Sequence, residues 1–112
     1  MIKSKPQTEI GYVYAICRSD IPQPHFSVQV AHAVLAATNS YGNPHKTHPN
    51  LIVCVVPDER TLDDLFNTLK ESGVPCVAWY EEDMGRQLTS VATGILHGDQ
   101  RKAFRKLRLL KS

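Results

Sequence analysis

The sequence predicts an α/β fold, a three-layer α/β/α sandwich built on a mixed, mostly parallel sheet of four strands. The first observation is that short apolar runs alternate with segments of helical periodicity, as they do in parallel βαβ units. The second is that residues 51–56 are apolar throughout and largely β-branched, which is typical of a strand covered on both faces. The third is that no helical segment separates the last two predicted strands, so one pairing can be antiparallel and the sheet mixed.

The first predicted strand spans residues 10–17, and the helix after it spans about 26–38. In this helix, apolar residues recur at i, i+3, i+4 and i+7 on one face: Val30, Ala33, Val34 and Ala37. Residues 39–44 are rich in turn formers and end the helix.

The second predicted helix follows the strand at 51–56 and starts at residues 57–59, where Asp58 and Glu59 suit a helix N-terminus. Its apolar stripe consists of Leu62, Leu65, Phe66 and Leu69. Gly73 is expected to end it.

The last third of the chain predicts a strand at 76–80, a polar loop at 81–90, a fourth strand at 91–96 and a helix capped by Asp99. Three residues of this helix are expected to face inward: Ala103, Phe104 and Leu107.

Residues 1–9 are expected to form a flexible polar arm, and residues 10–112 a single domain. No apolar run approaches the roughly 20 residues that a membrane span needs, and the first residues have no apolar signal core. We therefore expect a cytoplasmic protein without membrane contact. The three cysteines lie in apolar runs and are interpreted as buried thiols in a reducing compartment.

The net charge of +2 conceals an uneven distribution. Residues 101–112 contain six basic side chains and no acidic one, whereas the rest of the chain contains seven basic and eleven acidic side chains. A basic tail on a mildly acidic body indicates a polyanion partner, with a solvated basic helix end as the alternative.

Polar residues gather where the first strand ends and the first helix begins. Asp20 follows the strand, His25 precedes the helix, and Gln29 and His32 share one helical face. Ligand sites of α/β proteins usually lie at such strand ends, and helix N-termini favour anions, so we expect a site here.

Four segments together resemble the type II peptidyl-tRNA hydrolase family, over about residues 12–111. The first combines Arg18-Ser19-Asp20-Ile21 with Gln29-Val30-Ala31-His32-Ala33, the second runs from Val55 to Leu62 through Pro57-Asp58-Glu59, the third is Glu82-Asp83-Met84-Gly85-Arg86, and the fourth is Leu107-Arg108-Leu109-Leu110. Through Trp79, Glu81 and the basic tail, the chain also resembles a eukaryotic branch known for containing this domain.

The resemblance implies a homodimer that hydrolyses the ester between a peptide and the terminal ribose of tRNA, without a metal or another cofactor. In the family, a lysine at the start of the first helix, an aspartate in an Asp-x-Gly-Arg loop and nearby threonines are implicated in activity. Here His25 occupies the lysine position, Asp83 matches the aspartate, and Thr93 matches a threonine through a gap. The substrate-binding residues implied are Asp20, Gln29, His32, Arg86, Arg101, Lys102 and Arg105.

The chain departs from the family pattern at two of these positions. No lysine lies between Lys5 and Lys46, and Gln87 stands where the family has threonine after its Gly-Arg pair.

Each candidate also has a structural interpretation. Asp83 can accept loop amide hydrogen bonds, and Arg86 can form a surface ion pair. His25 can be a surface residue, and His32 a packed helix residue. Gln29 and Asp20 can brace loop backbone. Of the histidines, only His45 and His48 have metal-ligand spacing, and no cysteine or acid joins them, so we expect no metal site.

Three functions therefore remain open on sequence alone. The leading hypothesis is a peptidyl-tRNA hydrolase-like enzyme. The second is a non-catalytic RNA- or protein-binding module with the same fold, and the third is a small regulatory domain that binds a metabolite.

Overall fold

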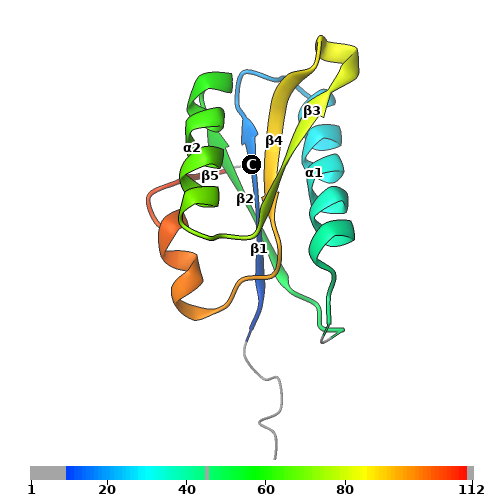
Figure 1. Ribbon diagram of the computed structural model, residues 1–112. Coiled ribbons are helices and arrows are strands. Elements are labelled where there is room, and N and C mark those ends of the chain that lie inside the picture. The colour runs from blue at the N-terminus through cyan, green and yellow to red at the C-terminus, as the bar shows by residue number, and fades with distance from the viewer. Residues whose placement is uncertain (1–9, 45, 111–112) are drawn as a thin grey trace, which may run out of the picture.

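Five strands form one mixed sheet in the order β3-β4-β1-β2-β5 (Figure 1). The computed structural model describes residues 10–44 and 46–110. The strands are β1 (Tyr12–Arg18), β2 (Asn50–Val56), β3 (Cys76–Glu81), β4 (Gln87–Thr93) and β5 (Arg108–Leu109). β1 and β2 pair in parallel, whereas β4 is antiparallel to β1 and β3, and β5 is antiparallel to β2. The prediction of a mixed sheet is confirmed.

Helices lie on both faces of this sheet. They are α1 (His25–Tyr41), α2 (Glu59–Glu71) and the 3₁₀ helices η1 (Glu82–Met84) and η2 (Gly98–Phe104). Figure 1 shows α1 on one side of the sheet and α2 with η2 on the other. On the α1 side the contact is made by small residues, Ala15, Ala33, Ala37 and Ala92, so the helix approaches the strands closely.

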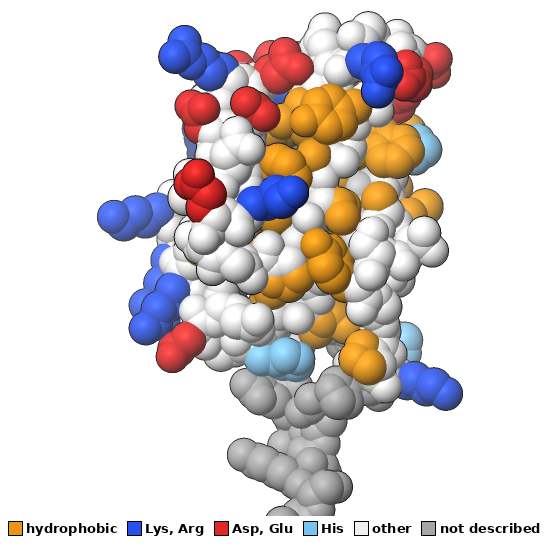
Figure 2. Space-filling model, in the orientation of Figure 1, with side chains coloured by type: hydrophobic (Ala, Val, Ile, Leu, Met, Phe, Trp, Pro, Cys, Tyr) orange, Lys and Arg blue, Asp and Glu red, His pale blue; other side chains and the backbone are white. Residues whose placement is uncertain are grey.

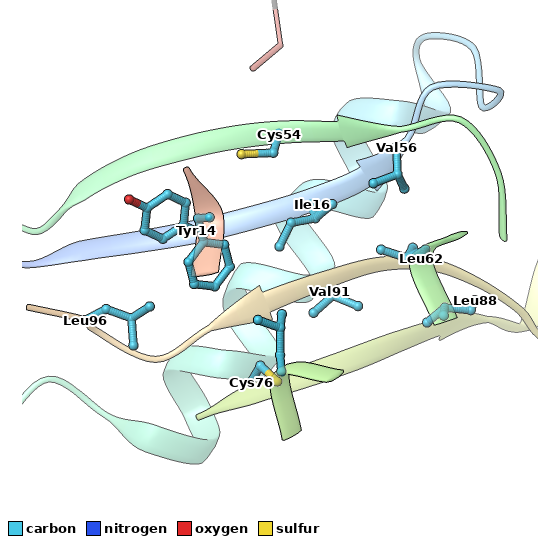
Figure 3. Close-up of a cluster of buried hydrophobic side chains, with 11 residues drawn as sticks. Tyr14, Ile16, Cys54, Val56, Leu62, Cys76, Leu88, Val91 and Leu96 are labelled. Carbon is cyan, nitrogen blue, oxygen red and sulfur yellow. The ribbon is translucent and has the colours of Figure 1, made fainter. Parts of the chain in front are cut away.

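The larger core fills the space under α2 and η2. Figure 3 shows Ile16 and Val91, from neighbouring strands, together with Leu62 of α2 in this cluster. The ring of Phe104 stacks on Tyr14 with a centroid distance of 4.2 Å and attaches η2 to the sheet. Burial of such side chains contributes about 1.5–3 kcal/mol each.

The predicted second helix is confirmed with its end signals. Asp58 is the N-cap, and its Oδ1 accepts a hydrogen bond of 2.9 Å from the amide of Thr61. Gly73 follows the helix with φ of 79°, a conformation that glycine adopts without a steric penalty.

The final third of the chain differs from the prediction. The strand expected at 91–96 lies at 87–93, because the segment read as a polar loop already pairs with β3 from Gln87 onward. The sheet has a fifth strand that was not predicted, and only one of the pairings among its neighbouring strands is parallel, so "mostly parallel" is wrong.

The expected last helix is the 3₁₀ helix η2, which begins after His97 rather than at Asp99. Phe104 is buried and Leu107 half-buried as expected, but Ala103 is exposed. A 3₁₀ helix has three residues per turn, so its buried stripe differs from that of an α-helix.

Among the described helices, none is long and apolar enough to cross a membrane. The predicted arm at 1–9, His45 and Lys111 lie outside the described residues.

Candidate functional site

Three segments meet at one end of the sheet, where β1 and β3 finish and β4 begins. They are the turn after β1, the start of α1 and the η1 turn between β3 and β4. Met84 of η1 packs against the buried cluster of Cys17, Ile21 and Phe26, which fixes the η1 turn beside the start of α1. Two predicted site residues adjoin this contact in the sequence, since His25 precedes Phe26 and Asp83 precedes Met84.

A buried guanidinium organises the turn after β1. Arg18 is 8% exposed, and its Nε and Nη2 donate to the two carboxylate oxygens of Asp20, each at 2.9 Å. Its Nη1 donates to Oε1 of Gln87 at 2.7 Å and to the carbonyl of Leu88 at 3.1 Å. The hydrogen bonds with Asp20 raise the pKa of Arg18 above its usual value. The predicted substrate ligand Asp20 is therefore held within the protein by a bidentate ion pair.

Gln29 joins α1 to both β3 and β4. Its side chain is buried, its Oε1 accepts from the hydroxyl of Thr89 at 2.7 Å, and its Nε2 donates to Oε1 of Glu81 at 3.0 Å. The hydroxyl of Ser90 donates to the backbone carbonyl of Gln29 at 2.7 Å. Both ends of the amide side chain are thus satisfied, and the carboxylate of Glu81 is oriented by α1.

The carboxylate of Glu81 also receives a hydrogen bond of 3.5 Å from the amide of Asp83. Donation by Gln29, aided by the amide of Asp83 and the proximity of His32, lowers the pKa of Glu81 below its usual value. His32 lies one helical turn beyond Gln29 and stacks on Trp79, with a centroid distance of 4.5 Å and an interplanar angle of 8°. His32 is therefore packed on an aromatic side chain and remains half-buried.

The side chains predicted to act directly on substrate lie at the surface of this end. His25, Asp83 and Arg86 are exposed. Arg86 Nε lies 3.3 Å from Glu82 Oε1, and both side chains are at least 70% exposed, so this ion pair is weak. Arg86 itself has φ of 61° and follows Gly85, which has φ of 70°, so a left-handed bend precedes β4.

The start of α1 offers fewer free donors than the sequence suggested. The amides of Phe26, Ser27 and Val28 all donate to oxygen atoms of the preceding loop, residues 22–24. These three amides are therefore already used within the protein.

Thr93 is not brought together with His25 and Asp83. It lies at the far end of β4, six residues or roughly 20 Å along the strand from Gln87. Its buried hydroxyl accepts from the amide of Tyr14 at 3.0 Å and donates to the carbonyl of Gly94 at 2.7 Å. Thr93 therefore ties β4 to β1, and the threonine beside Gln29 is Thr89.

The basic residues of η2 also lie at that far end. Arg101 Nε donates to the hydroxyl of Tyr14 at 2.9 Å, and its guanidinium lies 3.4 Å from the centroid of the Tyr12 ring. Hydrogen bonding to Tyr14 raises the pKa of Arg101. Lys102 is exposed and lies 3.7 Å from Asp99, and Arg105 is exposed.

Arg101 and Arg105 border a groove of about 390 Å³ with Tyr14, Phe104 and Leu107. The predicted substrate-binding set is thus divided between the two ends of the sheet.

The chemistry available at the carboxyl end of β1 is that of carboxylates, histidines and an arginine. Burial raises the pKa of the Cys17 thiol to about 12, so this thiol is protonated and is no nucleophile at neutral pH. Within residues 10–44 and 46–110, no group of three or more His, Cys, Asp or Glu is placed to hold a metal ion.

Sequence reasoning missed Glu81 and Thr89 as members of this network. Both were assigned to a polar loop, although Thr89 lies within β4 and Glu81 ends β3. The ion pair between Arg18 and Asp20 could have been predicted, since residues i and i+2 at a strand end project to the same face.

No protein-family model matches the chain, and no curated protein matches its sequence. Among solved structures, a protein of unknown function from Agrobacterium tumefaciens strain C58 is similar, with a TM-score of 0.59 and 13% sequence identity. The match covers 90% of this chain and 98% of that chain. The shared feature is the fold.

Proposed function

We propose that this protein is a hydrolase of the type II peptidyl-tRNA hydrolase kind, which acts in the cytoplasm on the ester between a peptide and the terminal ribose of tRNA. The observation that carries the proposal is the convergence of the Asp83 turn and the first turn of α1, where Met84 packs against the cluster that contains Phe26. The Arg18–Asp20 pair and the Gln29–Glu81 contact stabilise this arrangement from below. The exposed side chains of Asp83, His25 and Arg86 are thus attached to segments held by buried contacts, and catalysis by proximity and orientation requires such fixed positions.

In this reaction a water molecule attacks the carbonyl carbon of the ester, and Asp83 accepts its proton. The bond between that carbon and the ribose oxygen breaks, the oxygen takes up the proton that Asp83 accepted and becomes a hydroxyl, and the peptide leaves as a carboxylic acid. His25 donates to the oxygen on which negative charge develops, in place of the lysine of the resembling family. Arg86 contacts a phosphate of the tRNA end, which its weak pairing with Glu82 leaves it free to do.

The test is release of peptide from an N-blocked aminoacyl-tRNA by the purified protein. We expect Asp83→Asn to lower turnover by about 10²–10⁴-fold, the range for an acid–base group. Asp63→Asn, at an exposed aspartate of α2, is the matched control and is expected to retain full turnover. Equal turnover by the wild type and Asp83→Asn, or none by the wild type at high enzyme concentration, contradicts the proposal.

A non-catalytic RNA-binding module is the second candidate, and one observation favours it. No lysine lies at the start of α1, and His25 there is exposed. A wild type that binds tRNA without hydrolysing its ester supports this candidate. If His25 instead acts in catalysis, His25→Ala should lose turnover and His25→Lys should retain it, since lysine supplies a cation at the same position.

A further inference from the structure

The strand β3 forms an open edge of the sheet, since among the described strands it pairs with β4 alone. It has six residues and contains no lysine, arginine or proline, which are the residues that usually oppose pairing at an edge. The other edge strand, β5, has only two residues, one of them Arg108. The β3 edge is therefore the one that is competent to bind an extended peptide as an additional strand.

Apolar side chains flank the β3 edge on both faces of the sheet. Val77 and Trp79 are half-buried against α1, Ala78 is half-buried on the α2 side, and Tyr80 is 46% exposed. Figure 2, in the same orientation as Figure 1, shows hydrophobic side chains along the front of the molecule, where β3 lies between α1 and α2. A peptide strand on this edge thus has apolar surface for the side chains on either of its faces.

The hydrogen-bonding phase of β3 identifies which backbone groups face outward. The amide of Gly94 donates to the carbonyl of Pro75 at 2.9 Å, so Pro75 bonds toward β4. In an antiparallel ladder alternate residues bond to the same neighbour, so Val77 also bonds toward β4. Cys76 and Ala78 therefore direct their backbone groups out of the edge.

The residue opposite Tyr80 shows that Tyr80 faces outward as well, beyond the irregularity in the ladder between Trp79 and Tyr80. Tyr80 lies opposite Leu88. The amide of Leu88 donates to Glu59 at 2.8 Å, and its carbonyl accepts from Arg18 at 3.1 Å, so Leu88 bonds away from β3. Tyr80 is then in a pair without mutual backbone hydrogen bonds, and its N–H and C=O point out of the edge.

The open part of the edge leads directly to the turn that holds Asp83. β3 ends at Glu81, and η1, which contains Asp83, follows it at once. At the other end of β3, the hydroxyl of Tyr41 donates to the carbonyl of Cys76 at 3.1 Å and so occupies that outward group. The outward groups that remain are those of Ala78 and Tyr80, which are the ones nearer to the proposed catalytic carboxylate.

Charge at this end of β3 distinguishes an ester from a free acid. Glu81, Glu82 and Asp83 follow one another there, and the last two are exposed. The ester carbonyl of peptidyl-tRNA is uncharged, whereas the released peptide ends in a carboxylate that these acidic side chains repel. The edge therefore suits the peptide before hydrolysis and disfavours it afterwards.

We propose that the peptide of peptidyl-tRNA pairs with the β3 edge as an additional strand, parallel to β3, so that its ester end lies at the Asp83 turn. One peptide residue donates its N–H to the carbonyl of Ala78 and accepts from the N–H of Tyr80, as parallel strands pair. Main-chain pairing of this kind accepts peptides of any sequence. This inference rests on the proposed hydrolase function and adds to it the site for the peptide.

The test compares two N-acetylated esters of the same tRNA, one with a single amino acid and one with a tetrapeptide that ends in that amino acid. The tetrapeptide extends roughly 10 Å farther from the ester, along the edge. We expect the wild type to hydrolyse the tetrapeptidyl ester with a kcat/KM about tenfold higher or more, as expected for two added backbone hydrogen bonds.

Changes to the substrate test the pairing without altering the protein. The peptide N–H is replaced by N–CH₃ at the second, third or fourth residue from the ester. Because alternate residues of a paired strand bond to the same neighbour, the loss of kcat/KM should alternate along the peptide. Equal loss at all three residues, or loss at none, overturns pairing with the edge.

Ala78→Pro tests the edge from the side of the protein, because it removes an outward N–H and no bond to β4. The ratio of kcat/KM between the two esters should fall to about one. Leu51→Pro is the matched control: the amide of Asn50 bonds toward β1 at Gly11, so Leu51, which is 53% exposed, faces the opposite edge. It should retain the wild-type ratio, and circular dichroism should show that both variants fold.

The outcomes separate this inference from the function on which it rests. A wild type that hydrolyses neither ester contradicts the proposed hydrolase, and the peptide site with it. Equal kcat/KM for the two esters, or a ratio that Ala78→Pro leaves unchanged, overturns the peptide site alone. Sedimentation velocity tests the other occupant, since a wild-type dimer that Ala78→Pro dissociates would show that a second copy covers the edge, which also overturns the proposal.

Discussion

The two ends of the sheet hold their polar side chains in different ways. At the carboxyl end of β1, Arg18 and Gln29 are buried, and each satisfies several partners from other elements. At the opposite end, the basic side chains of η2 are mostly exposed, and Arg101 is held at the surface by Tyr12 and Tyr14. The first end has a geometry fixed by internal hydrogen bonds and suited to chemistry, and the second has exposed charge suited to electrostatic attraction.

The distance between the two ends limits which ligands can contact both. They lie at opposite ends of strands of seven residues, which span roughly 20 Å. A ligand that contacts both must be extended and anionic at one end, as a polynucleotide is. The RNA proposed above is long enough to contact both ends, whereas a small metabolite can contact only one.

The largest effect on stability is expected from Arg18→Met at the first end. The substitution leaves the carboxylate of Asp20, the amide of Gln87 and the carbonyl of Leu88 without their shared donor. We expect a loss of about 2–4 kcal/mol in the free energy of unfolding, at the low end for a broken buried pair because Asp20 is 42% exposed.

Urea denaturation measures this loss, with Arg86→Met as the matched control. Arg86 is 75% exposed, so its replacement should change stability by no more than about 0.5 kcal/mol. Equal effects of the two substitutions would show that the Arg18 network contributes no more to stability than an exposed arginine does.

A smaller effect is expected from Gln29→Met, which keeps the side-chain length but removes both polar atoms. It leaves the buried hydroxyl of Thr89 with only the carbonyl of Trp79, at 3.4 Å, and the carboxylate of Glu81 with only the amide of Asp83, at 3.5 Å, at a cost of about 1–3 kcal/mol. A double-mutant cycle with Thr89→Val should show coupling between the two substitutions, because removing both partners costs less than the sum. Strict additivity would show that the Gln29–Thr89 contact does not act as a unit.

Much of the fold was predictable because its signals are local. The apolar run of β2 and the stripe and cap of α2 depend on residues a few positions apart. The strand and the helix are confirmed, although Leu51 of the strand expected to be covered on both faces is 53% exposed. The start of β4 was not predictable in this way. Gln87, Thr89 and Ser90 are polar, and they form a strand because β1 and β3 on either side and α1 above supply hydrogen-bond partners.

Only the part of the candidate site that depends on local sequence was predictable. Asp20, Gln29 and His32 do lie at the end of the sheet where Asp83 stands, because the strand end and helix start that carry them are adjacent in sequence. Glu81 and Thr89 join them only through contacts between residues more than 50 positions apart. Thr93 and Arg101 were grouped with this site, and the antiparallel course of β4 carries the chain away from it.

Acid is expected to weaken the first end through Glu81. The pKa of Glu81 is lower in the folded chain than its ordinary value, so its carboxylate contributes stability above about pH 5, and this contribution is lost as the pH falls through the folded pKa. Glu81→Gln should therefore flatten the fall in melting temperature below about pH 5. Glu71→Gln, at an exposed glutamate of α2, is the control, and an equal flattening there would show that Glu81 has no special role.

The smallest effect on stability, and the sharpest on binding, is expected at the second end. Arg105 and Lys106 are exposed, and no ion pair within the described residues involves them, so replacing both with alanine should leave the melting temperature unchanged.

If this end attracts RNA, each lost phosphate contact should reduce the slope of log affinity against log salt by roughly 0.7–0.9. Arg60→Ala, at an exposed arginine of α2, is the control for the loss of one positive charge elsewhere on the surface, against which the effect per charge removed is compared. A slope that Arg105→Ala/Lys106→Ala leaves unchanged would show that the basic end is a solvated surface. RNA affinity, if present, would then have to come from the end that holds Asp83 and Arg86.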